Sequence, residues 1–276
     1  MKGLLALALL LPGVAFSQSL VSIWDRALYG NTPGISALTL SGYNGGPTTT
    51  YEAVSPESAA YSFRSAAMSS PYCASSSAND TSAGTGARTI SVTGVDTSYA
   101  AFTETLTMNG QTSVTFTTTN ILGINNVTVL TAGSGGSNAG VIRCGTGTNT
   151  AGVPAVVEAH VAVGLNQQQS FIYTVPANYT LICDGLSVAN KHTTAANAYD
   201  FALDTIVNGG VRVRKQLGYM ETGGGNPSFF PFKIKFAEKT QLQLQVLAAT
   251  ATDPVFASMN CLLVVSGSSS QLQRTF

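Results

Sequence analysis

The chain has 276 residues, of which 44% are hydrophobic and only 9% charged, and its 13 basic and 13 acidic side chains give a formal net charge of zero. Soluble proteins carry about 25% charged residues, so uncharged Thr, Ser, Gly, Asn and Gln supply most of the polarity here. A neutral chain has no overall electrostatic attraction to nucleic acid or to an anionic membrane surface. We therefore expect no nucleic-acid partner.

Residues 1–17 have the pattern of a secretory signal peptide. Lys2 precedes the Leu-rich run 4–11, and Ala15 and Ser17 form a small-x-small cleavage site. The apolar run is too short to cross a bilayer comfortably, so we expect no membrane span. Two interpretations stay open: cleavage during export, or retention of the segment as an apolar plug in an assembly.

The rest of the region before residue 78 shows no core of its own. Apolar side chains in 20–29 recur at helical spacing, which predicts a short amphipathic helix. The stretch 36–77 contains turn signals such as Gly45-Gly46-Pro47 and no clear strand pattern. We therefore expect residues 1–77 to form an apolar segment, a short helix and an extended arm that takes its stability from a neighbouring domain or subunit.

From Thr89 onward the pattern changes to strands, with turn signals about every ten residues. Alternation of apolar and polar side chains is clearest in 232–236 and 242–246. Asn109-Gly110 and Asn208-Gly209 are hairpin signals, because both central residues of a type I′ turn need positive φ. No sustained helix separates the strands, which argues against a βαβ architecture.

These patterns predict an all-β fold of antiparallel β-sandwich or jelly-roll modules behind the N-terminal arm. We expect a first sandwich at 78–165, a second, jelly-roll-like sandwich at 166–266, and a loose tail at 267–276. One larger double-sheet domain is the alternative.

Three segments carry a resemblance to known proteins: DTSAGTGART at 80–89, ETLTMNG at 104–110 and TAGSGGSNAG at 131–140. In this order they resemble a family of virion structural proteins of tailed bacteriophages, especially aquatic ones, over roughly residues 78–265. The resemblance implies a structural role in the virion, other virion proteins as partners, and a homo-oligomer, with a trimer by analogy. The position on the particle stays open among capsid surface or decoration, fibre and tail. No catalytic residues are implied.

Motifs for catalysis are absent, since the chain contains no HExxH, GxSxG, P-loop or GxGxxG pattern. Glu158 and His160 share one strand face, as either an acid–base pair or an exposed polar face, and His192 falls in an expected loop. Asp200 and Asp204 also share a face, and paired carboxylates cleave glycosides. The short repeats of a β-helical depolymerase are missing, however. We expect no enzyme and no cofactor.

Two pairs of basic residues alternate with apolar residues: Arg212 with Arg214, and Lys233 with Lys235. Strand geometry places each pair on one face, opposite the core. These faces either contact an acidic neighbour or a host-surface glycan, or they keep exposed strands from aggregating edge to edge.

The cysteines fit no metal-binding spacing. They form either one or two disulfides, in any of three pairings, or small apolar side chains within strands. The four are Cys73, Cys144, Cys183 and Cys261.

Asp80, with Asn79 and the carbonyls of 84–86, is either a Ca²⁺ site or an Asx turn. Asn79, Asn126 and Asn178 begin N-glycosylation triplets, which a chain rich in Asn and Thr also forms by chance.

The sequence as a whole predicts a non-enzymatic virion protein that acts by assembly. The alternative is a secreted or surface-displayed bacterial adhesin or carbohydrate-binding protein, which would use the signal peptide and form disulfides.

Overall fold

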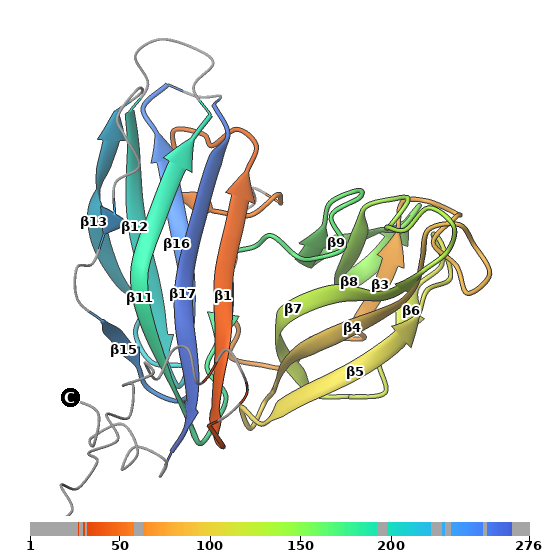
Figure 1. Ribbon diagram of the computed structural model, residues 1–276, viewed down its shortest axis with the longest axis horizontal. Helices are drawn as coiled ribbons and strands as arrows, with labels where there is room; N and C mark the ends of the chain where they lie inside the picture. Colours follow the sequence, from red (N-terminus) through yellow and green to blue (C-terminus); the bar gives the residue numbers. More distant parts are fainter. Residues whose placement is uncertain are drawn as a thin grey trace, which may run out of the picture.

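The computed structural model describes residues 27, 30, 32–57, 63–191, 198–221, 228–229, 233–250 and 253–266. Every named element in these residues is a β-strand, and every named strand pair is antiparallel. The expectation of an all-β, antiparallel fold is therefore confirmed. The sheets lie in two bodies side by side (Figure 1). We call the body built from β3–β9 module I, and the body built from β1, β2 and β10–β17 module II.

Module II consists of two facing sheets. One has the strand order β1-β17-β11-β14, with β15 beside β11, and the other the order β10-β16-β12-β13, with β2 beside β16. Apolar residues that alternate along β16 and β17 point between the sheets, into a core with side chains from both layers. The strands are β1 Ile35–Asn44, β2 Glu52–Ala53, β10 Ile172–Thr174, β11 Tyr179–Asn190, β12 Ala198–Val207, β13 Val213–Glu221, β14 Ser228–Phe229, β15 Ile234–Phe236, β16 Thr240–Ala248 and β17 Val255–Val265.

Module I is smaller and has its own core. One sheet has the order β6-β3-β8-β9 and the other β5-β4-β7. Fully buried Ile90, Ile121 and Ile142 pack between them. These pairings do not establish a jelly-roll order. The strands are β3 Tyr72–Ser75, β4 Ala87–Asp96, β5 Ala101–Thr107, β6 Val114–Thr115, β7 Ile121–Ala132, β8 Ile142–Thr150 and β9 Val153–Val161.

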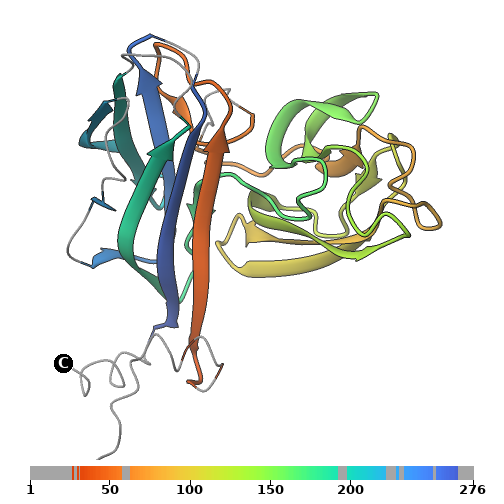
Figure 2. The same ribbon diagram turned by 45° about the horizontal axis from the view of Figure 1, so that its top comes forward.

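The expectation of an irregular arm throughout 36–77 was wrong. Strand β1 pairs with β17 along its whole length, from Ile35 opposite Val264 to Asn44 opposite Val255, and these two strands lie side by side in both ribbon views (Figure 2). The sequence of β1 is rich in Ser, Thr and Gly, so it carries little strand signal by itself. Its stability comes from a partner more than 200 residues away, which a local pattern does not reveal.

Other N-terminal predictions are not tested. The signal-like residues 1–17, the expected helix at 20–29 apart from Ala27, and the tail at 267–276 lie outside the described residues. The division at 165 and 166 stays a prediction. The strand pairing itself assigns β1 and β2 to module II, although both precede module I in sequence.

The two hairpin signals had different outcomes. Asn208 and Gly209 both have positive φ and join the paired strands β12 and β13, so that hairpin is confirmed. Asn109-Gly110 does not close a hairpin between its flanking strands, because β5 pairs with β4 and β6 pairs with β3. Instead, the Gly110 N–H donates to the carbonyl of Asp80 at 2.7 Å. A tertiary partner has replaced the local turn.

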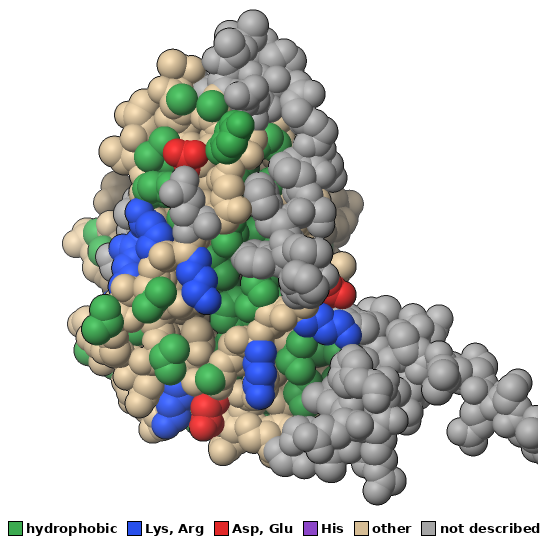
Figure 3. Space-filling view, turned by 90° about the vertical axis from the view of Figure 1, so that its left-hand side faces the viewer, with side chains coloured by type: hydrophobic (Ala, Val, Ile, Leu, Met, Phe, Trp, Pro, Cys, Tyr) green, Lys and Arg blue, Asp and Glu red, His purple; other side chains and the backbone are tan. Residues whose placement is uncertain are grey.

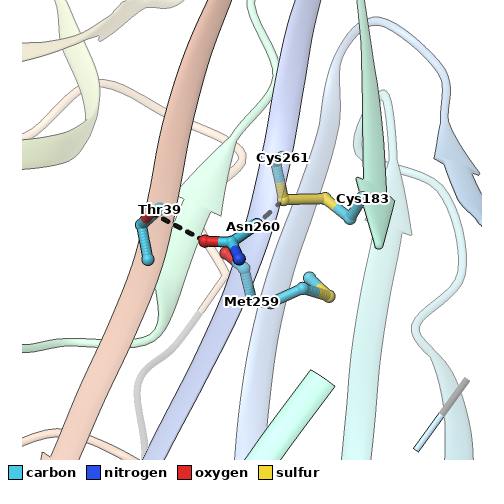
Figure 4. Close-up of a disulfide and its surroundings, with 5 residues drawn as sticks. All are labelled: Thr39, Cys183, Met259, Asn260 and Cys261. Carbon is cyan, nitrogen blue, oxygen red and sulfur yellow. Dashed lines mark hydrogen bonds between the residues drawn. A yellow bond between two sulfur atoms is a disulfide. The ribbon is translucent and has the colours of Figure 1, made fainter. Parts of the chain in front are cut away.

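Each module contains one disulfide between paired strands. Cys73 on β3 is bonded to its register partner Cys144 on β8, and Cys183 on β11 to its register partner Cys261 on β17 (Figure 4). Asn260, next to Cys261, points to the other face of its sheet and accepts a hydrogen bond from Thr39 on β1. Of the three pairings that the sequence left open, the structure has the one that keeps each disulfide within a single sheet.

Candidate functional site at the junction of the modules

The largest hollow in the described residues is a cleft of about 650 Å³ between the two modules. Strand β9 of module I forms one wall. Ala53, Ile172 and the segments 55–57 and 63–67, which lead from β2 towards module I, form the other. The charged residues of this cleft come from both sides, and they form two ion-pair groups.

Glu57 is the centre of the first group. Its Oε1 lies 2.6 Å from His160 Nδ1 and accepts a hydrogen bond from Arg143 Nε at 2.6 Å. The hydrogen bond with His160, together with the bond and charge of Arg143, outweighs burial and lowers the pKa of Glu57 to about 2. The Glu57 carboxylate therefore stays ionised through the ordinary pH range and holds β8 and β9 against the segment that follows β2.

Glu158 and Arg64 form the second group. Arg64 Nε donates to Glu158 Oε1 at 2.9 Å, and Arg64 Nη2 also contacts this oxygen. Burial raises the pKa of Glu158, and the hydrogen bond and charge of Arg64 only partly oppose this. The side-chain amide of Gln241 on β16 holds the main chain of Arg64 by accepting from its N–H at 3.0 Å and donating to its carbonyl at 2.7 Å. This group connects module I to the core sheet of module II.

The expected exposed face at Glu158 and His160 was wrong, since these residues are only 8% and 7% exposed. They do not pair with each other either, because each has a partner on the opposite wall. Among the described residues, the chemistry of the cleft is therefore that of a structural junction, with each carboxylate matched to a cation. Glu57, Arg64 and Arg143 are isolated charges in the sequence, and no local pattern singled them out.

The predicted basic face at Arg212 and Arg214 is also different in the structure. Both arginines form ion pairs with Asp204, whose side chain is fully buried. Burial raises the pKa of Asp204, but the hydrogen bonds and charges of Arg214 and Arg212 outweigh it, so the net pKa is lowered. The guanidinium group of Arg214 also lies 4.3 Å from the centre of the Tyr51 ring. Asp204 is thus committed to two arginines and does not form a catalytic pair with Asp200.

Lys233 and Lys235 are exposed beside and on β15. On the side of module II that carries β13 and β15, Lys and Arg side chains are spread among apolar and uncharged polar ones (Figure 3). Their contact with an acidic protein or a glycan stays a prediction. His192 lies outside the described residues.

Asp80 is fully buried in module I and organises three loops. Its Oδ1 accepts the N–H of Ala87 at 2.6 Å and of Ala139 at 2.8 Å, and its Oδ2 accepts the N–H of Gly140 at 2.9 Å and the hydroxyl of Ser75 at 2.5 Å. Both oxygens are occupied by protein donors. Among the described residues, no group of three or more His, Cys, Asp or Glu is placed to hold a metal, so the Ca²⁺ interpretation has no support.

The glycines around Asp80 follow from this packing. A Cβ on Gly86 would overlap Asp80 Oδ1, one on Gly84 would overlap the carbonyl of Asn79, and one on Gly133 would overlap the carbonyl of Gly84. The Gly-rich motifs at 80–89 and 131–140 are therefore two parts of one structural unit.

No protein-family model and no curated protein matches the chain. Among solved structures, the VP2 subviral particle of infectious bursal disease virus overlaps 84% of this chain and 72% of its own, at 9% identity and a TM-score of 0.26. The structure of T=1 particles derived from the same virus overlaps 85% and 70%, at 12% identity and a TM-score of 0.25. Overlaps this weak carry no conclusion about fold or function. No helix in the described residues is long and apolar enough to cross a membrane.

Proposed function

We propose that this chain is a non-enzymatic structural protein of a tailed-phage virion, at the capsid surface or as a decoration, fibre or tail-associated component. It would act by assembly with other virion proteins and with copies of itself, with a trimer as the analogy. The observation that carries the proposal is the scarcity of charge on a β-protein with exposed apolar side chains. The resemblance of 80–89, 104–110 and 131–140 to virion proteins then selects the kind of particle.

The exposed apolar residues are grouped rather than scattered. Leu130 on β7 is 53% exposed and Leu165 is 48% exposed, and they lie near each other because Thr128 forms a β-bridge with Gln167. On module II, Val211 and Val213 beside the β12–β13 hairpin are 84% and 48% exposed. Apolar groups on a surface so poor in ions favour contact with another protein surface.

Mass spectrometry of purified source particles tests this function directly. We expect peptides from this chain at a constant molar ratio to the major coat protein through a density gradient. Particles that lack the chain would refute the virion role. Sedimentation of the purified protein tests self-assembly. We expect an oligomer in the wild type and a shift toward monomer in Leu165→Glu, whereas Leu217→Glu in the partly buried core margin serves only as a folding control.

A secreted adhesin or carbohydrate-binding protein is the second candidate, and the two disulfides favour it, because disulfides persist in oxidising compartments outside the cytoplasm. Intact-mass measurement on protein from the native source separates the candidates. Export predicts a mature chain that begins near Gln18, whereas virion assembly without export predicts a chain that begins at the initiator residue.

A further inference from the structure

Two small cavities lie along β1, near where its free edge faces module I. One, of about 310 Å³, is between β1, β4, β7 and the segment 167–173. The other, of about 260 Å³, lies on module II beside Tyr43 and Phe256. Ser41 lines both, so the two cavities are adjacent. Neither belongs to the charged cleft described above.

The 310 Å³ cavity is lined by neutral hydrogen-bonding groups. Asn125 is fixed in place, because its side chain donates to the carbonyl of Thr174 at 2.9 Å and accepts from its N–H at 2.7 Å. The hydroxyls of Thr39 and Thr93 also line it. Gln168 is 4% exposed, and neither its Oε1 nor its Nε2 has a hydrogen-bond partner. Buried amides are normally paired, so this one offers both a donor and an acceptor to an occupant.

The 260 Å³ cavity combines aromatic rings with hydroxyls. The Tyr43 and Phe256 rings lie across the β1–β17 pair with centroids 4.9 Å apart and planes inclined by 41°. Phe256 is 44% exposed. The hydroxyl-bearing residues Ser187 and Ser258 line the same cavity. The rings present an apolar surface beside polar groups, the combination that orients a small ligand.

The described linings of both cavities contain no Asp, Glu, Lys, Arg or His. A charged ligand would lose its hydration there without gaining an opposite charge. A ligand with many hydroxyls and an apolar C–H face matches both linings: the hydroxyls pair with amides and hydroxyls, and the C–H face packs on an aromatic ring.

We propose that these cavities form one binding groove for a neutral oligosaccharide. One sugar unit packs on Phe256 and Tyr43, and an adjacent unit enters the amide-lined cavity at Gln168. The groove uses β1 and β17 of module II together with β4 and β7 of module I, so it exists only when the modules are joined. The proposal goes beyond the assembly function and does not depend on it, because a virion protein and a secreted protein could both use such a groove.

The test is binding of the full chain to defined neutral hexasaccharides of glucose, mannose, galactose and xylose, measured by saturation-transfer NMR and titration calorimetry. We expect at least one to bind, and Phe256→Ala and Gln168→Leu each to weaken binding by about tenfold or more. Tyr219→Ala is the matched control, since Tyr219 is 64% exposed on β13, away from the groove, and should bind as the wild type does.

Three results would overturn the groove: no binding of any hexasaccharide at millimolar concentration, equal binding by Phe256→Ala, or binding confined to sulfated or uronic-acid glycans. Because Phe256 is on the surface, Phe256→Ala decides the question even if Gln168→Leu folds poorly. The virion test by mass spectrometry has no bearing on this outcome, so the two proposals fail separately.

Discussion

The buried carboxylate of Asp80 accepts the backbone N–H of Ala139, 59 residues further along the chain, at 2.8 Å. The same carboxylate also satisfies the N–H groups of Ala87 and Gly140. Loops that connect different strands of module I are thus held by one side chain rather than by a ladder of backbone bonds. Asp80 is therefore the residue on which the Gly-rich loops depend.

We predict that Asp80→Ala destabilises the protein by about 3 to 5 kcal/mol, because three backbone N–H groups would lose a charged acceptor and each unpaired buried group costs about 1 to 3 kcal/mol. Urea unfolding measures the change. Asp96→Ala is the matched control, since Asp96 accepts from the N–H groups of Ser98 and Ala100 in an exposed turn and should cost less. A stabilising effect of Ca²⁺ that Asp80→Ala abolishes would contradict this account.

Glu57 gives a pH dependence with a definite sign. Its pKa is about 2 in the folded protein and near 4.3 in an unfolded chain, so its contribution to stability is complete above the unfolded value and is lost as the pH falls towards 2. Because Glu57 is partly exposed, solvent screening reduces this contribution to about 1 to 2 kcal/mol.

We expect Glu57→Gln to lose that amount at pH 7 and nothing at pH 2, as measured by denaturant unfolding at a series of pH values. Glu238→Gln is the control, because Glu238 accepts only from the exposed N–H of Asn178 among the bonds described. Parallel pH curves for the wild type and Glu57→Gln would show that the carboxylate does not connect the modules.

Arg64 compensates the buried charge of Glu158. Breaking a buried pair from one side costs about 3 to 5 kcal/mol, whereas replacing both members by apolar residues can be nearly neutral. We therefore expect Arg64→Met to be strongly destabilising at pH 7 and the double variant Arg64→Met/Glu158→Leu to recover most of the loss. Thermal unfolding measures both. Additive losses in the double variant would exclude direct coupling between the two side chains.

The accuracy of sequence-based prediction followed the range of the interactions. Strands with their own alternation, such as 242–246 in β16, were predicted because the core face is written locally in Leu242, Leu244 and Val246. Strand β1 was missed because its pattern is supplied by β17. Asn109-Gly110 misled because Asp80 binds it from another loop. Charged residues at the junction were missed or misplaced for the same reason: their partners come from the other module.

The disulfide between Cys183 and Cys261 joins β11 to β17, the strand that also carries β1. It closes a loop with a sequence separation of 78 residues, and closing a loop of this size restricts the unfolded chain by about 4 to 5 kcal/mol. We expect the variant Cys183→Ala/Cys261→Ala to lose up to this amount in urea unfolding, and Cys73→Ala/Cys144→Ala, with a separation of 71 residues, to lose nearly as much. In the wild type purified without reductant, Ellman's reagent should detect no thiol after denaturation. Four reactive thiols together with unchanged stability would show that these cysteines act only as small apolar side chains.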